Sequence, residues 1–230
     1  MQHAPVLELR AASSAFDAST LPSAALELRL LAGECALIEA HDPATIADFA
    51  DLCSGLIVLR AGSVRCMDHD WSELDRERAA ALRGRIGRTH QRGGWPAMLP
   101  THVSIMLPQL HHTRTPPAQI TRSAVAISRL LGLPGLPLTR PGQLAEGDLV
   151  RAGCARAFLG APDLLLFESS LGADRPDLTV PFLDLLSQAL DRGAAAICFT
   201  REASFWRAQR FPLSHRLVLH EDGLAQMRGD

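Results

Sequence analysis

A strand, a short loop and a helix follow one another in residues 33–56, whose sequence is GECALIEAHDPATIADFADLCSGL. Cys35–Glu39 is a short apolar run and predicts a buried strand. Asp42 and Pro43 are residue types preferred at a helix N-cap and at the first helical position. Apolar residues then recur on one helical face until Gly55, which predicts the end of the helix. These residues predict one strand–loop–helix unit of an α/β core.

Strands and helices alternate on both sides of this unit. Further strands are expected at Val6–Arg10, Ala25–Leu31, Leu56–Leu59, Ser63–Met67, Leu164–Phe167 and Ala194–Phe199, with a C-terminal hairpin of Arg216–His220 and Leu224–Met227. Helices are expected from Ser72 and Asp75 to Arg85, around Ile120–Leu131, around Leu149–Leu159 and at Pro181–Leu190, and a surface or partner-facing loop at 91–116. The alternation predicts an α/β fold with a mostly parallel sheet.

The composition is that of a soluble globular protein. The chain has 230 residues, 47% of them hydrophobic, and a formal net charge of -2, which is enough to bury a sizeable core. Basic residues are not interleaved with aromatic residues, so no nucleic-acid partner is expected. No apolar run approaches the roughly 20 residues that cross a bilayer, and the N-terminus does not resemble a secretion signal. A cytoplasmic protein is therefore expected.

The basic residues restrict the chemistry further. All 23 of them are arginine, and the chain contains no lysine. A guanidinium group does not replace a compact ammonium group in a tight phosphate-binding loop, so chemistry that needs such a lysine is excluded. The five cysteines are scattered without C-x-x-C spacing, which predicts buried reduced thiols rather than a metal site or disulfides.

Several motifs, in register along nearly the whole chain, resemble those of ABC-transporter ATP-binding subunits. Gly33-Glu34 with the strand and helix that follow resembles the phosphate-loop region, residues 82–91 the approach to the Q-loop glutamine, Pro141–Asp163 the signature helix, and Leu164–Glu168 the Walker B strand. The resemblance implies a P-loop NTPase-like α/β fold, namely an ABC nucleotide-binding domain with an antiparallel β subdomain and an α-helical subdomain. A single domain, 1–230, would contain a RecA-like core with the β subdomain in 1–90 and 142–230, and the helical subdomain at about 91–141.

Two shorter segments resemble one subfamily. His111-His112-Thr113 to Ile120 and the pair Gly93-Gly94 are similar to the ATPase subunit of Mla-type lipid transporters, which work with substrate-binding MCE proteins. The resemblance implies a membrane-associated phospholipid-transport complex.

The phosphate loop of such a subunit has lost its chemistry here. That loop needs glycines whose backbone N–H groups surround the phosphates, a lysine, and a hydroxyl group for magnesium. The matching positions hold Ala40, Thr45, Ile46 and Ala47. Pro43 also removes one N–H donor, and Asp42 is expected to cap the helix itself, with its carboxylate where a phosphate would bind.

The other family motifs are altered as well. The signature, which would contact the nucleotide of an opposite subunit, is Leu144-Ala145-Glu146-Gly147-Asp148, so a carboxylate replaces a glycine. Glu168 matches the magnesium-binding aspartate, and Ser169 and Ser170 match the catalytic glutamate and the proline after it. With a one-residue shift Glu168 would be the general base, but it would then lack the preceding aspartate. Arg201 matches the switch histidine, and Gly172-Ala173-Asp174-Arg175 is a poor D-loop.

Two positions keep the residue types of the family. Gln91 matches the Q-loop glutamine, and Phe16 matches the aromatic residue that stacks on adenine, although a local hydrogen-bonding role and a core role explain them better. His111 and His112 are adjacent in a predicted extended loop, so their side chains should point apart, and no third metal ligand is evident. We expect neither a metal nor a cofactor.

These motifs predict a non-catalytic ABC subunit. In an ABC dimer, such a pseudo-ATPase would inactivate both ATP sites, one because of Ile46 and the other because of Glu146. No ATP-driven dimer cycle is therefore expected. The expected role is structural or regulatory, in a complex with an ABC permease and an MCE-type protein. The chain is expected to form a dimer with itself or with another ABC ATPase. Through the permease it would be peripheral to the inner face of the cell membrane. The partner surface expected for a coupling helix is formed by Gly93, Gly94, Trp95, Pro96 and Met98. Two alternatives stay open: a nucleotide-binding ABC ATPase with residual or altered activity built on Gln91 and Glu168, and a soluble regulator that dimerises with an active ATPase.

Overall fold

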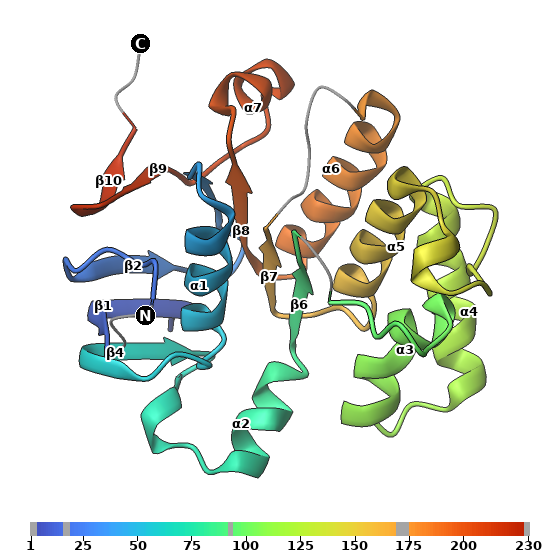
Figure 1. Cartoon of the computed structure of the whole chain (residues 1–230), viewed down its shortest axis with the longest axis horizontal. Helices are drawn as coiled ribbons and strands as arrows, with labels where there is room; N and C mark the ends of the chain where they lie inside the picture. Colours follow the sequence, from blue (N-terminus) through green and yellow to red (C-terminus); the bar gives the residue numbers. More distant parts are fainter. Residues whose placement is uncertain (1–3, 16–18, 92–93, 169–174, 228–230) are drawn as a thin grey trace.

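The computed structural model describes residues 4–15, 19–91, 94–168 and 175–227, which form two sheets and the helices around them (Figure 1). Phe16, Gly93, Ser169, Ser170 and the predicted D-loop residues 172–174 lie outside the described residues. The predictions made for them therefore stay predictions. None of the helices in the described ranges is long and apolar enough to cross a membrane.

The smaller sheet is antiparallel and has the strand order β2-β1-β4-β5. It contains β1 (Leu7–Ser14), β2 (Leu26–Leu30), β4 (Leu59–Cys66) and β5 (His69–Asp70). The sequence predicted two strands, Leu56–Leu59 and Ser63–Met67, where the structure has the single strand β4. A register shift between Arg10 and Ser13 of β1 opposite β4 breaks the ladder, which explains why the period-2 pattern is interrupted.

The larger sheet has the order β10-β9-β3-β8-β7-β6. Its strands are β3 (Cys35–Glu39), β6 (Ile86–Thr89), β7 (Leu164–Phe167), β8 (Ala195–Thr200), β9 (His215–His220) and β10 (Gly223–Gln226). The strands from β9 to β6 are parallel, and only β10 pairs antiparallel, with β9. The mostly parallel sheet and the C-terminal hairpin are thus confirmed.

Helices cover both faces of this parallel sheet. They are α1 (Pro43–Cys53), α2 (Arg76–Arg83), α3 (Thr101–His112), α4 (Pro117–Leu130), α5 (Glu146–Phe158), α6 (Pro176–Asp191) and α7 (Ala203–Gln209), with 3-10 turns at Trp71–Glu73 and Pro141–Gln143. Successive strand residues point to opposite faces. Leu164 and Leu166 accordingly pack with α1 and the antiparallel sheet, whereas Leu165 and Phe167 pack with α5 and α6.

The segment predicted as a loop contains a helix. The prolines and histidines of residues 91–116 indicated a loop, but α3 occupies Thr101–His112 and includes Pro108. Proline lacks the N–H that would bond the carbonyl of Ser104, a cost that the burial of Ile105 and Met106 against α4 and α5 offsets. His111 and His112 therefore end a helix, and their rings meet edge to face with centroids 4.6 Å apart. The prediction that they point apart in an extended loop was wrong.

Two other element predictions need correction. The helix expected from Ser72 begins at Arg76 with Asp75 as its N-cap, because Ser72 belongs to a 3-10 turn that Asp70 caps. The helix expected from Pro181 begins at Pro176 and contains Pro181. In addition, three short elements, β5, β6 and α7, were not predicted, since none is long enough to show a clear period.

Candidate functional site

In the loop between β3 and α1, a side chain of the protein itself caps the N-terminus of the helix. Asp42 is the N-cap of α1, and its carboxylate accepts hydrogen bonds from the backbone N–H of Ala44 at 3.2 Å and of Thr45 at 3.1 Å. The Thr45 hydroxyl lies 2.8 Å from the same carboxylate. These bonds, the Thr45 hydroxyl first, lower the pKa of Asp42. The predicted helix cap is confirmed, and the two N–H groups that a bound anion would use are occupied.

Ile46, which the sequence matches to the lysine of a phosphate loop, has a buried side chain. It is 1% exposed and packs in the core below α1, in the cluster that also contains Ile38 and Phe49. Ala40, at the end of β3, is buried as well. Apolar contacts thus stabilise the β3–α1 turn of this chain. A nucleotide-binding loop, by contrast, exposes charged and polar groups.

A hollow remains beside this turn. It measures about 580 Å³, and its lining includes Thr20, Asp42, Thr45, His220 and Glu221. Two of these residues carry carboxylates, so the hollow does not favour a polyphosphate.

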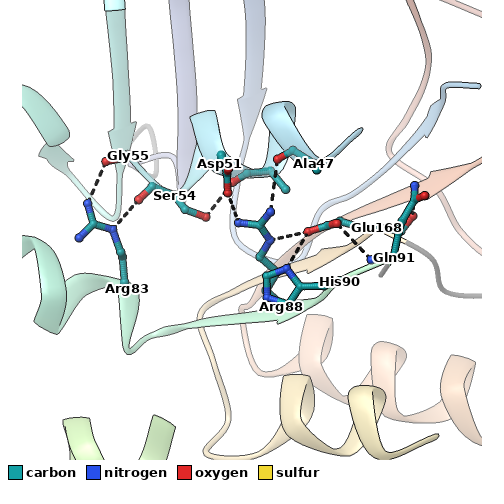
Figure 2. A network of polar contacts seen from close by, with 10 residues as sticks. Ala47, Asp51, Ser54, Gly55, Arg83, Arg88, His90, Gln91 and Glu168 are labelled. Atoms are coloured by element: carbon teal, nitrogen blue, oxygen red, sulfur yellow. Dashed lines mark hydrogen bonds and ion pairs between the residues drawn. The ribbon is translucent and has the colours of Figure 1, made fainter. Parts of the chain in front are cut away.

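An arginine links the far end of α1 to the end of β7 (Figure 2). The guanidinium group of Arg88, on β6, lies 2.5 Å from a carboxylate oxygen of Asp51 and 2.5 Å from one of Glu168, and it donates to the carbonyl of Ala47 at 3.3 Å. Arg88 is 13% exposed and Glu168 is 2% exposed. A buried carboxylate is stable only when it is paired, and here the chain supplies the cation.

Glu168 has further partners. His90 Nδ1 lies 3.4 Å from Oε1 of Glu168, and the backbone N–H of Gln91 donates to Oε2 at 3.2 Å. The side-chain amide of Gln91 also donates to the backbone carbonyl of Glu168 at 3.1 Å. Burial alone would raise the pKa of Glu168, but the His90 hydrogen bond and the charge of Arg88 outweigh it and hold this pKa below its usual range. Gln91 and Glu168, which the sequence placed in one site, are therefore in contact (Figure 2).

The side chain of Trp95 packs on Arg156 of α5. The guanidinium carbon lies 4.4 Å from the indole ring centre, a cation–π contact, and Nη1 of Arg156 donates to the carbonyl of Gly94 at 2.5 Å. Burial lowers the pKa of Arg156 to about 10. Trp95 thus faces α5.

Gly94 and Pro96, two residues of the predicted partner surface, line a groove between β6 and α3. It measures about 220 Å³, and its lining includes Gly84, Arg88, His90, Gly94, Pro96 and Leu107. Trp95 and Met98 do not line it. Trp95 lines the neighbouring pocket with Gln91 and Glu146, and Met98 is 77% exposed to solvent. The apolar residues of this groove include Pro96 and Leu107, and Leu107 is 42% exposed. The partner surface stays a prediction.

The altered signature begins a helix. Leu144 and Ala145 precede α5, and Glu146, Gly147 and Asp148 form its first turn. Glu146 is 86% exposed at its side chain and pairs with Arg175 at 3.2 Å. Carboxylates are favourable at a helix N-terminus, so α1 and α5 both begin with their own negative charge. Glu146 also lines a small pocket of about 140 Å³ with Gln91 and Trp95.

The remaining predicted residues are placed as follows. Arg201 follows β8 and is exposed. Pro43 is the first residue of α1, and Ala47 contributes only its backbone carbonyl, which accepts from Arg88. Within the described ranges, no three His, Cys, Asp or Glu side chains gather in a way that would hold a metal ion.

Comparison with solved structures assigns the fold. The dimeric ATP-binding cassette MJ0796, in a post-hydrolysis state with ADP and Pi, superposes with a TM-score of 0.79 over 97% of this chain and all of that one, at 16% identity. An ATP-binding subunit of an ABC transporter gives 0.77 over 96% and 90%, at 14% identity. The chain has the fold of an ABC nucleotide-binding domain. The predicted fold class is confirmed.

Sequence relatives agree with this fold. The methionine import ATP-binding proteins MetN of Xanthomonas oryzae pv. oryzae and Xanthomonas axonopodis pv. citri are 29% identical over 178 residues, which are 77% of this chain and 53% of theirs. The chain thus spans about half the length of the curated relatives it matches. No protein-family model matches the sequence. The resemblance to ABC ATP-binding subunits is confirmed at this level, and the finer resemblance to the Mla/MCE type stays a prediction.

Sequence reasoning missed Arg88 and Arg156. Both are charged residues in segments that turn out to be largely buried, and a charged residue in a parallel strand implies a buried partner. A charged residue within a strand could have pointed to Arg88, but only if residues 86–89 had first been predicted as a strand. The partners Asp51 and Glu168 are 37 and 80 residues away.

Proposed function

We propose that this chain is a non-catalytic ABC subunit that docks on a permease of an Mla/MCE-type lipid-transport complex. The observation that carries the proposal is the β3–α1 turn: the lysine position holds the buried Ile46, and the helix N-terminus holds the carboxylate of Asp42. A nucleotide would have to displace that carboxylate and would gain no ammonium group in return.

The remaining motifs support the same conclusion. Glu168 is paired with Arg88, so its charge is neutralised from within the chain. Glu146 would place a second carboxylate against any phosphate held by an opposite subunit, and like charges in a poorly hydrated site repel strongly. We therefore propose that the chain drives no ATP-dependent dimer cycle, either with itself or with another ABC ATPase.

The groove between β6 and α3 is the proposed docking surface for the permease. Its lining combines apolar residues, among them Pro96 and Leu107, with the polar residues Arg88, His90 and Arg156. A short amphipathic helix fits such a lining, because its apolar residues would cover Leu107 while its polar residues stay in water. Docking of this kind keeps the subunit at the inner face of the membrane through its partner.

Nucleotide binding is tested by calorimetry on the purified chain with ATP and magnesium. We expect no saturable heat, and no ATPase turnover that depends on this subunit in the purified complex. Saturable binding would favour the alternative of residual or altered nucleotide use through Gln91 and Glu168.

Docking is tested by co-purification with a permease from detergent extract. Leu107→Arg should release the chain from the permease, because it places a charge at the apolar groove. Val58→Arg is the matched control, since Val58 is equally apolar, 61% exposed and outside the groove lining. Unchanged co-purification of Leu107→Arg would contradict the groove assignment, and co-purification with an active ATPase in place of a permease would support a soluble regulator.

The cargo is tested separately. The relatives MetN are named for methionine import, whereas a lipid cargo for this chain rests on the resemblance of Gly93-Gly94 and of residues 111–120 to Mla-type subunits. Genes for a permease and an MCE protein next to the gene of this chain would support lipid transport. Genes of a methionine importer in that place would contradict it.

A further inference from the structure

The docking groove and the altered phosphate site share one arginine. Arg88 lines the groove, and its guanidinium group contacts α1 through Asp51 and the end of β7 through Glu168. Figure 2 shows this group between the two carboxylates, and it shows Arg83 of α2 contacting Ser54 and Gly55, just after α1. One side chain therefore joins three elements: α1, β6 and β7.

The network continues from Glu168 to the groove wall. One carboxylate oxygen of Glu168 lies 3.4 Å from the His90 ring, and the other accepts the Gln91 N–H at 3.2 Å. The His90 ring lies against Gly94, so closely that a Cβ on Gly94 would come within 2.5 Å of it. His90 and Gly94 both line the groove. Arg88 thus reaches the groove wall directly and through Glu168.

The strength of this link follows from burial. The Glu168 side chain is 2% exposed, and a carboxylate in that position needs a fixed cation to stay charged. Arginine suits the place because its planar group offers several donors at once, whereas a lysine is a single point charge. A cation from solution would connect α1 with Glu168 only while it is bound. Arg88 makes this connection permanently because it is part of the chain.

We propose that Arg88 is a positioning residue that holds the partner groove in its docking arrangement without any ligand. This rests on the proposed function, since it takes the groove between β6 and α3 as the permease site. Arg88 stabilises the ionised form of Glu168, Glu168 fixes His90 and the amide of Gln91, and these fix the wall at Gly94. The subunit is then always ready to dock.

The test uses the full chain with Arg88→Met and with Arg83→Met as the matched control. Arg83 contacts the segment just after α1, through the carbonyls of Ser54 at 2.9 Å and Gly55 at 2.8 Å, and among the described residues it has no direct contact with Glu168. Hydrogen exchange of the Gln91 amide and the dissociation constant for a detergent-solubilised permease are measured for each variant. We expect Arg88→Met to speed exchange at Gln91 about tenfold or more and to weaken permease binding about tenfold, with both values unchanged in Arg83→Met.

Arg88→Lys covers the case in which Arg88→Met does not fold. It keeps the charge but cannot span both carboxylates, so exchange at Gln91 should rise roughly threefold. Wild-type exchange at Gln91 in both Arg88 variants overturns the inference, and so does equal acceleration in Arg83→Met. If the wild-type chain does not bind a permease, the proposed function fails; exchange at Gln91 then decides alone whether Arg88 orders the groove wall.

Discussion

A lysine at position 46 should not restore a phosphate loop, because the structure buries that position. Ile46 is 1% exposed, and removing its apolar surface from the core costs about 2–3 kcal/mol. An ammonium group in apolar surroundings has its pKa lowered by about 3–5 units, at about 1.4 kcal/mol for each unit. The lysine stem recovers most of the apolar contact, so the charge dominates, at about 4–7 kcal/mol, and the lower end applies because the stem lets the charge approach water. We therefore expect Ile46→Lys to lower the free energy of unfolding by about 4 kcal/mol.

The measurement is urea unfolding followed by tryptophan fluorescence, combined with calorimetry in ATP and magnesium. Ile46→Met is the control, since it keeps the volume and the apolar character and should cost less than about 1.5 kcal/mol. A loss of about 4 kcal/mol is a large part of the stability of an ordinary domain, so the midpoint should fall clearly below that of Ile46→Met. If Ile46→Lys is as stable as Ile46→Met and binds ATP saturably, position 46 faces the loop and our assignment of the β3–α1 turn is wrong.

Two further predictions concern the elements around the site. Burial would raise the pKa of Glu168, but the His90 hydrogen bond and the Arg88 charge outweigh it, so this pKa lies below its ordinary value of 4.5. The contribution of ionised Glu168 to the free energy of unfolding is therefore complete above about pH 4.5. It is lost as the pH falls through the lower pKa of the folded state. Glu168→Gln should therefore flatten the decline in unfolding free energy measured between about pH 6 and pH 3, and an unchanged slope would show that Glu168 is not the titrating group. Gly87→Ala would place a Cβ 2.0 Å from the carbonyl oxygen of Ala157 and should cost about 2–3 kcal/mol in urea unfolding. Gly135→Ala, with no atom within 4 Å of its added Cβ, should stay within about 0.5 kcal/mol, and equal stability of the two variants would contradict the close approach of β6 to α5.

Local patterns in the sequence predicted the elements that local chemistry determines. The strand Cys35–Glu39 coincides with β3, and Asp42 before Pro43 caps α1 as expected. Both depend on residues that are neighbours in the chain, so their signals are complete within a few positions.

The helix α3 and the direction of Trp95 could not be predicted in the same way. Pro108 disfavours a helix interior, and only packing against α4 and α5 reveals why the helix forms there. Trp95 was expected in the partner groove, but its ring packs on Arg156, which is 61 residues later in the sequence, and Trp95 does not line that groove. Long-range contacts of this kind leave no periodic pattern in one sequence.

The carboxylate of Asp42 is attached to the helix whose N–H groups it occupies. An anion from solution competes for those groups at its own concentration, whereas a carboxylate two and three residues from the N–H groups of Ala44 and Thr45 competes at a fixed effective concentration set by the tether. Dilution of the protein does not lower that value, and neither does any change in the surrounding pool of metabolites. The start of α1 should therefore keep the same hydrogen bonds as long as phosphate-bearing solutes stay well below that effective concentration. Ordinary changes in the phosphate compounds around it then leave this helix end unaltered.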